Sequence, residues 1–207
     1  MENEKKIVIA VDLNDVLRDY TRNFGQYFKR SLDPDIDLEQ VEVKSNKMNE
    51  VFDFESRSEY ERFVYEDYPW ELFGKCPACD RGLGAAFINW TTKTLSNVDI
   101  DSKVEVILVS PFEYGLTIPA TYWFISRLGA RVREVYLPMD SMTIWDRCDI
   151  LFTANPQLLK NKPEGKTSVK IDADYNKDVE SDFSFISMTN FLEDGSNTES
   201  ILRSREQ

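Results

Sequence analysis

Short apolar runs alternate with stretches of helical periodicity along most of the chain. The runs at residues 7–11 and 104–109 are rich in β-branched side chains, as expected for strands that are buried on both faces of a sheet. Similar runs follow at 132–137, 149–152, 167–171 and 183–186. Helical spacing of apolar residues occurs at 16–28, 56–67, 78–95, 117–128 and 188–203, with an interruption near Gly195. This alternation predicts an α/β fold with a parallel sheet and helices on both faces.

Polar side chains stand where several of these strands end. They are Asp12 and Asn14 after the first strand, Ser110 after the second, and further groups at 153–155 and 172–174. In open parallel sheets, ligands bind beyond the carboxyl ends of the strands. The sequence therefore predicts a functional site at this edge of the sheet.

Length and charge indicate a single-domain protein and exclude some classes of partner. The chain has 207 residues, which is typical of a single domain, and its 25 Lys and Arg against 37 Asp and Glu give a formal net charge of −12. Such an acidic protein repels phosphate backbones, so we expect no direct nucleic-acid partner. We find no apolar window of about 20 residues and no signal peptide in Met1–Lys6. We therefore expect no membrane partner and a location in the cytoplasm, or in a larger particle assembled from it.

The sequence contains no histidine, which excludes Ser-His-Asp and Cys-His catalysis and zinc sites that include histidine. Acid–base chemistry must come from carboxylates, Lys, Tyr or Cys. The three cysteines do not indicate a disulfide scaffold. Cys76 and Cys79 form a Cys-x-x-Cys pair, which we interpret as a structural turn, with a redox motif or a zinc half-site as alternatives.

Three segments together resemble the motifs of the haloacid dehalogenase-like superfamily. The first is an apolar strand followed by Asp12-Leu13-Asn14-Asp15-Val16-Leu17, which is similar to the family's opening pattern Asp-x-Asp-x-(Thr/Val)-Leu. Ser110 resembles the second motif, and residues 149–156, with Tyr175-Asn176 beyond them, resemble the last. The order and spacing are closest to the deoxyribonucleotidase-like branch. The resemblance implies one Rossmann-like domain over 1–207, with a small helical cap inserted at about 18–75.

The resemblance also implies a role for each motif residue. Asp12 stands at the position of the nucleophile that attacks phosphorus, and Ser110 at that of a phosphate-binding hydroxyl. Asn14 replaces the family's acid–base aspartate, and a side-chain amide neither donates nor accepts a proton near pH 7. The family's lysine is also missing, because the stretch 138–148 contains only Arg147 as a base.

The resemblance further implies a Mg²⁺ site that this chain fills poorly. Magnesium is usually held by carboxylates together with substrate phosphate. The candidate ligands are Asp12, Asn14 through its backbone carbonyl, Asn155, and Asp172 from a neighbouring strand end. We therefore expect no cofactor, or Mg²⁺ if the protein is active.

The degenerate motifs lead to one expectation and two alternatives. We expect a chain that is not an enzyme, and that serves as a structural or protein-interaction component of a larger assembly, with protein partners or as a homo-oligomer. The first alternative is a Mg²⁺-dependent, nucleotidase-like phosphohydrolase with Asp12 as nucleophile. The second is a protein that binds phosphate or nucleotide without turnover.

Overall fold

The structure is a computed structural model, and it describes residues 6–98, 100 and 102–205. The prediction that the first residues carry no signal peptide falls, except for Lys6, outside this described part.

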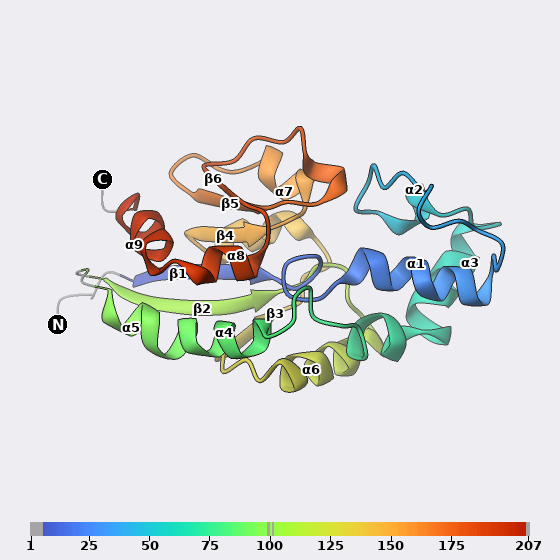
Figure 1. The fold of residues 1–207 in the computed structure, drawn as a ribbon, viewed down its shortest axis with the longest axis horizontal. Coiled ribbons are helices and arrows are strands. Elements are labelled where there is room, and N and C mark those ends of the chain that lie inside the picture. The colour runs from blue at the N-terminus through green and yellow to red at the C-terminus, as the bar shows by residue number, and fades with distance from the viewer. Residues whose placement is uncertain (1–5, 99, 101, 206–207) are drawn as a thin grey trace.

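A six-stranded sheet forms the centre of the molecule, and all of its strand pairs are parallel (Figure 1). Its order is β3-β2-β1-β4-β5-β6, so the first strand lies in the middle. The strands are β1 (Lys6–Asp12), β2 (Lys103–Val109), β3 (Glu134–Tyr136), β4 (Ile150–Thr153), β5 (Thr167–Ile171) and β6 (Phe183–Phe185). This confirms the predicted α/β, Rossmann-like fold class.

Helices fill the connections between the strands. The α-helices are α1 (Tyr20–Ser31), α2 (Met48–Val51), α3 (Arg57–Arg62), α4 (Leu83–Asn89), α5 (Leu95–Asn97), α6 (Thr117–Leu128), α7 (Pro156–Lys160), α8 (Met188–Glu193) and α9 (Gly195–Arg203). Wider π-helical turns are η1 (Phe63–Asp67), η2 (Trp70–Gly74) and η3 (Trp90–Thr94), and 3₁₀ turns are η4 (Ser141–Arg147) and η5 (Asp174–Asn176). None of the helices in the described residues is long and apolar enough to cross a membrane.

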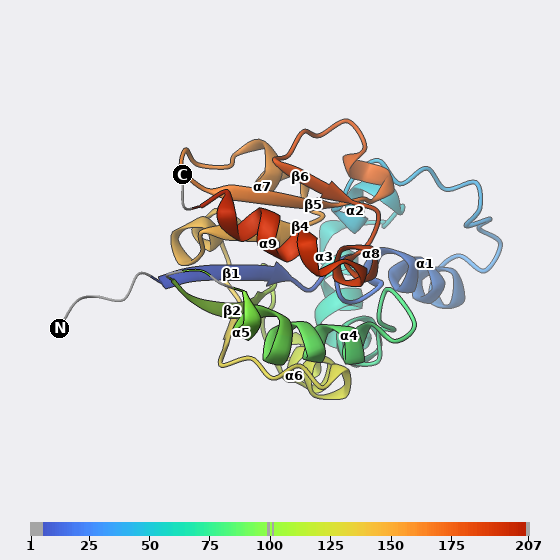
Figure 2. The same cartoon turned by 60° about the vertical axis from the view of Figure 1, so that its left-hand side comes forward.

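The first part of the β1–β2 connection has an apolar core of its own. In both views, α1, α2 and α3 lie beyond the carboxyl end of β1 (Figures 1 and 2). Phe24 and Phe28 of α1 pack there against Phe52 and Phe63, together with further buried residues of this connection. We call residues 20–74 the cap and the remainder the sheet domain.

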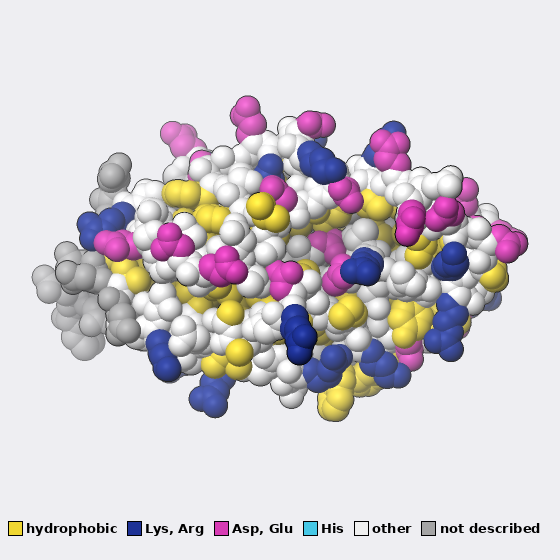
Figure 3. Space-filling model, viewed as in Figure 1, with side chains coloured by type: hydrophobic (Ala, Val, Ile, Leu, Met, Phe, Trp, Pro, Cys, Tyr) yellow, Lys and Arg dark blue, Asp and Glu magenta, His cyan; other side chains and the backbone are white. Residues whose placement is uncertain are grey.

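Charged side chains are unevenly spread over the surface. On the face shown in Figure 3, acidic side chains dominate the upper half, whereas Lys and Arg gather along the lower edge, where α4, α5 and α6 lie. The net acidity read from the sequence therefore does not describe every face equally.

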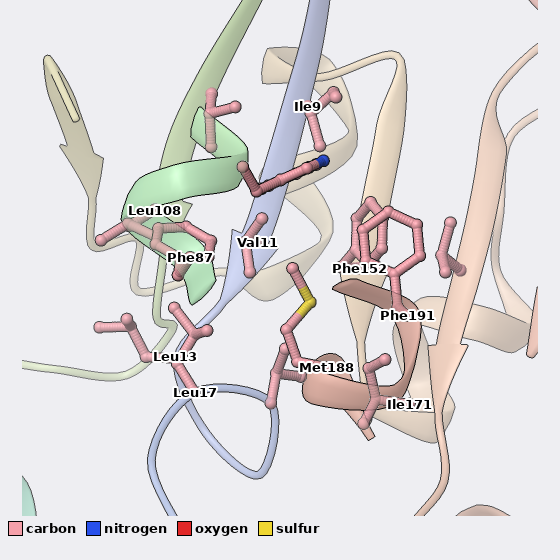
Figure 4. Packing of buried hydrophobic residues seen from close by; sticks show 14 of the residues in the cluster. Ile9, Val11, Leu13, Leu17, Phe87, Leu108, Phe152, Ile171, Met188 and Phe191 are labelled. Carbon is pink, nitrogen blue, oxygen red and sulfur yellow. The ribbon is translucent and has the colours of Figure 1, made fainter. Parts of the chain in front are cut away.

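Both faces of the sheet are covered, as the pattern predicts. On one face, Ile9, Val11 and Phe152 pack against Phe87 of α4 and Phe191 of α8 (Figure 4). On the other face, a smaller cluster joins β1, β2 and β4 to η4 and α7. Because β1 lies in the centre and is covered on both sides, the residue at its carboxyl end has a fixed position.

Glycines lie at two helix boundaries. Gly129 has φ +76° and ends α6 in the left-handed conformation that glycine adopts without strain. The interruption predicted near Gly195 separates α8 from α9, and Asp194 begins α9 by accepting a hydrogen bond from the backbone N–H of Ser196. The turns η4 and α7 are absent from the prediction, because each spans less than two turns of an α-helix and leaves little periodicity.

Candidate functional site

Asp12 is the last residue of the central strand, and only 2% of its surface is exposed. Its Oδ2 accepts a hydrogen bond of 2.8 Å from the hydroxyl of Thr153, the last residue of β4. Its Oδ1 accepts a longer bond of 3.3 Å from the backbone N–H of Asn14. The Thr153 hydroxyl accepts the Asn155 N–H in turn, which directs its own proton to Asp12. The carboxyl group is therefore held in one orientation.

Burial makes the carboxyl group of Asp12 a weaker acid than an ordinary aspartate. It raises the pKa of Asp12 from 3.8 to about 7, although the Thr153 hydroxyl, the Asn14 N–H and the charge of Arg18 all oppose the shift. Near neutral pH, the protonated form is therefore far more populated than it is in an ordinary aspartate. Perturbed carboxylates of this kind are concentrated at functional sites.

The loop after β1 is fixed by Asp15. This residue has φ +56°, a left-handed conformation that Asp tolerates better than most residues. Its carboxylate accepts hydrogen bonds from the backbone N–H and hydroxyl of Thr21, at 2.8 and 2.6 Å, and from the hydroxyl of Tyr175 at 2.7 Å. The loop is thus tied to the start of α1 and to η5.

A fully buried arginine lies behind this loop. Arg18 donates from Nε to Asn14 Oδ1 at 2.6 Å and from Nη1 to the Thr121 hydroxyl at 2.8 Å. Its Nη2 donates to the Ser110 hydroxyl at 3.0 Å and to Glu113 Oε1 at 2.5 Å, and neither side chain of this ion pair is exposed. We call these five residues the Arg18 cluster. It joins the β1 loop, the end of β2 and α6 through one cation.

The same guanidinium also contacts the cap. Its central carbon lies 4.8 Å from the centre of the Phe73 ring of η2, a distance at which a cation is attracted to an aromatic face. Phe73 packs in turn on Tyr20 of α1, with ring centres 5.4 Å apart. The Arg18 cluster therefore sets the position of the cap as well as that of the loops.

A cleft of about 660 Å³ lies between the cap and the carboxyl ends of the strands. Its sheet side includes Asp12, Asn14, Asp15 and Asn155, and its cap side includes the cations Lys47 and Arg57. This volume is in the range of small-molecule sites. Three of the strand-end residues that were predicted to form a site, Asp12, Asn14 and Asn155, therefore line one cavity.

Two of the predicted residues have other environments. Ser110 is fully buried, does not line the cleft, and accepts its hydrogen bond from Arg18. Asp172 lies along a separate hollow, where it accepts from the Ser184 hydroxyl at 3.0 Å and pairs with Lys170 at 3.5 Å. The structure therefore places Asp12, Asn14 and Asn155 together, without Ser110 or Asp172.

The side chains at the cleft do not fit the Mg²⁺ site that the resemblance implies. Asn14 Oδ1 is bound by Arg18, and Asn155 Oδ1 caps α7 by accepting the Gln157 N–H at 2.9 Å. Within residues 6–98, 100 and 102–205, no three acidic or cysteine side chains are grouped as a metal site requires. A magnesium site usually uses carboxylates, whereas the side-chain oxygens of Asn14 and Asn155 are neutral and committed to other bonds, so Asn14 could contribute only the backbone carbonyl that the resemblance implies.

Sequence reasoning missed the residues that organise the site, above all Arg18, Glu113 and Thr121. Arg18 stands beside Asp19 at the start of a helical pattern, so the sequence does not distinguish it from a surface arginine. Its partners Glu113 and Thr121 are 95 and 103 residues away in sequence. No local pattern could have indicated this pairing.

The Cys-x-x-Cys segment supports the same region. The backbone N–H of Cys79 donates to Leu17, and that of Asp19 donates to Pro77, so the segment pairs with the residues on both sides of Arg18. Both cysteines are free thiols, and burial raises the pKa of each far above its usual range. Thiols of this kind are poor nucleophiles, which favours the structural role.

A solved structure resembles the chain along nearly its whole length. A protein from Burkholderia xenovorans, described as a haloacid dehalogenase-like hydrolase, covers 94% of this chain and 99% of its own. The TM-score is 0.57 and the sequence identity is 10%. No protein-family model and no curated protein matches the chain. At this identity the similarity concerns the fold, and it confirms the haloacid dehalogenase-like resemblance at that level.

This similarity corrects the expectation that the chain is not an enzyme. That expectation rested on missing groups, namely the acid–base aspartate replaced by Asn14 and the absent lysine. The protein that this chain resembles in fold is described as a hydrolase, and the comparison gives no support to a non-enzymatic assembly role. Although these groups are missing, the buried carboxyl group of Asp12 and the cleft that it lines are present.

We predict that Asp12→Asn stabilises the protein, and more so at alkaline pH. Because folding raises the pKa of Asp12 to about 7, its contribution to stability is full below the unfolded pKa and is lost as pH rises to 7. Asn is uncharged at all pH values, like the protonated acid, although its NH₂ group cannot accept a hydrogen bond as the second carboxyl oxygen does. The difference in free energy of unfolding between the variant and wild type should increase by about 2 kcal/mol from pH 5.5 to pH 8. Urea denaturation at both pH values measures this, and an equal difference at both would contradict the raised pKa.

A double-mutant cycle tests the buried ion pair. Arg18→Met and Glu113→Leu should each cost about 3–5 kcal/mol of folding free energy, because each leaves a buried charge without its partner. The double variant should cost less than the sum by about 2 kcal/mol. Additive costs in denaturant titrations would show that the two side chains do not stabilise each other.

Proposed function

We propose that this protein is a hydrolase of phosphate monoesters with Asp12 as its nucleophile. The observation that carries the proposal is the placement of Asp12, a carboxyl group at the end of the central strand that lines a cleft of about 660 Å³. The fold similarity to a protein described as a hydrolase supports it.

The cleft offers binding groups for a phosphate dianion. Lys47 and Arg57 line its cap side, and in the free protein they pair with Glu50 at 3.0 Å and Glu61 at 2.8 Å. Because these pairs are solvent-exposed and worth little, a phosphate group can compete for either cation. An ester bound between these cations and Asp12 would have its phosphorus directed at the carboxylate.

The reaction then takes two steps. An Asp12 oxygen forms a bond to phosphorus while the ester P–O bond breaks, and the electron pair leaves on the alcohol oxygen. Water next attacks the phosphorus of the aspartyl phosphate, which releases inorganic phosphate and restores the carboxylate. Asn14 cannot protonate the leaving oxygen, because an amide has no proton to give near pH 7. The proton comes from water, so esters with poor leaving groups react slowly.

We predict that the purified protein hydrolyses 4-nitrophenyl phosphate and that Asp12→Asn abolishes this activity. The variant lacks the nucleophile and keeps the size of the side chain, but its single acceptor oxygen can keep only one of the hydrogen bonds from the Thr153 hydroxyl and the Asn14 N–H. Release of 4-nitrophenol measures the rate, with Tyr122→Leu as the control, since Tyr122 is 48% exposed and does not line the cleft. Equal rates in wild type and Asp12→Asn would exclude Asp12 as the nucleophile.

We also predict that Asn14→Asp speeds the hydrolysis of esters with poor leaving groups. A placed general acid contributes about 10²–10⁴ in rate. The gain here should be smaller, about tenfold, because Arg18 Nε lies 2.6 Å from the Asn14 oxygen and would favour the ionised carboxylate. Rates with phenyl phosphate and 4-nitrophenyl phosphate test this. If Asn14→Asp accelerates the hydrolysis of phenyl phosphate no more than that of 4-nitrophenyl phosphate, then protonation of the leaving group is not the function that is missing at Asn14.

A further inference from the structure

Three aromatic side chains line one part of the same cleft, where the cap meets the sheet domain. They are Tyr65 of η1, and Phe112 and Tyr114 of the loop after β2, and we call them the aromatic wall. The rings of Tyr65 and Tyr114 stack with their centres 4.0 Å apart and an angle of 25° between their planes. The Tyr65 hydroxyl donates to the backbone carbonyl of Phe112 at 3.3 Å. The wall is thus a continuous surface built from both parts of the protein.

Much of this aromatic surface is open to solvent. Phe112 is 47% exposed and Tyr114 is 40% exposed, although both belong to a loop whose neighbours Ser110 and Glu113 are buried. Exposed apolar surface is unfavourable relative to buried apolar surface. When such surface borders a cleft that also holds polar groups, a bound ligand is the expected cover.

The loop is held in a conformation that presents these rings. Phe112 has φ +64°, a left-handed conformation that is strained for a bulky residue. Its N–H donates to the Pro138 carbonyl at 2.8 Å, and the next residue, Glu113, is anchored to Arg18. Because strain of this kind persists only where surrounding contacts impose it, it marks candidate ligand sites.

The chemistry of the cleft points to the same class of ligand. With Asn14 at the position of the proton donor, the leaving oxygen has to depart as an anion. A phenol ionises near pH 10, so a phenolate departs far more easily than an alkoxide. An aromatic ring attached directly to the ester oxygen would therefore suit both the wall and the missing acid.

We propose that the substrate is an aryl phosphate, with its ring packed against Tyr114 and Phe112 and its phosphate directed at Asp12. This inference rests on the proposed function and specifies its substrate class. Attack by Asp12 breaks the bond between phosphorus and the aryl oxygen, and the phenolate takes a proton from water. The aromatic wall binds the leaving group, and Tyr114 and Phe112 determine specificity.

Binding of two matched phosphonates tests recognition of the ring without requiring turnover. Phenylphosphonate and cyclohexylphosphonate have similar size and charge and are not hydrolysed, but only the first has a planar aromatic ring. Wild type should bind phenylphosphonate about threefold to tenfold more tightly, as expected for one aromatic contact. Tyr114→Leu should lose this preference, because leucine keeps apolar volume but cannot stack. Isothermal titration calorimetry measures both dissociation constants.

Tyr122→Leu is the matched control, because Tyr122 is 48% exposed on α6 and does not line the cleft. It should keep the full preference for phenylphosphonate. Equal affinities of wild type for the two phosphonates, or an unchanged preference in Tyr114→Leu, would overturn the role of the wall. Binding of neither phosphonate would overturn it as well.

Turnover of phenyl and cyclohexyl phosphate separates this inference from the proposed function. Hydrolysis of both esters at equal rates, without a binding preference, would leave the hydrolase in place and remove the aryl specificity. A clear preference for phenylphosphonate without hydrolysis of either ester would instead contradict the hydrolase and keep the ring site.

Discussion

The guanidinium of Arg18 is out of contact with solvent, so its charge and its donors have to be matched inside the protein. Glu113 supplies the opposite charge, and Asn14, Ser110 and Thr121 supply neutral acceptors. These partners come from the loop after β1, the segment after β2 and α6, and the cap adds the ring of Phe73. Four separate parts of the chain therefore take their positions from one buried cation. The Arg18 guanidinium therefore orients Asn14. It also fixes the loop that carries the aromatic wall and the position of the cap.

At Asp12, by contrast, the ionisation state that the proposed reaction needs is not the one that stabilises the fold. Arg18 and the hydrogen bonds from Thr153 and Asn14 favour its ionised form, but burial has the larger effect and raises its pKa to about 7. The folded protein is thus less stable with the carboxylate that the proposed reaction needs than with the protonated acid. Stability lost in this way at a functional residue is a common trade-off in enzymes.

Much of the fold could be read from the sequence because local patterns determine it. The β-branched run of β1, the matching run of β2 and the glycine that ends α6 each predict their own structure from neighbouring residues. The polar residues at strand ends also indicated the edge of the sheet at which the cleft lies, and Asp12 and Asn155 line it. The roles of Ser110 and Asp172 could not be read in this way, because they depend on partners brought close by folding. Arg18 captures the Ser110 hydroxyl, and Lys170 and Ser184 hold Asp172 in a different hollow.

The proposed reaction requires a covalent bond between Asp12 and phosphorus. Rapid acid quenching of the protein during turnover of phenyl phosphate, followed by mass spectrometry of its peptides, tests this most directly. We expect one phosphoryl group on the peptide that contains Asp12, and none on that peptide from Asp12→Asn. Turnover with no phosphorylated peptide, or with the phosphoryl group on another residue, would contradict it.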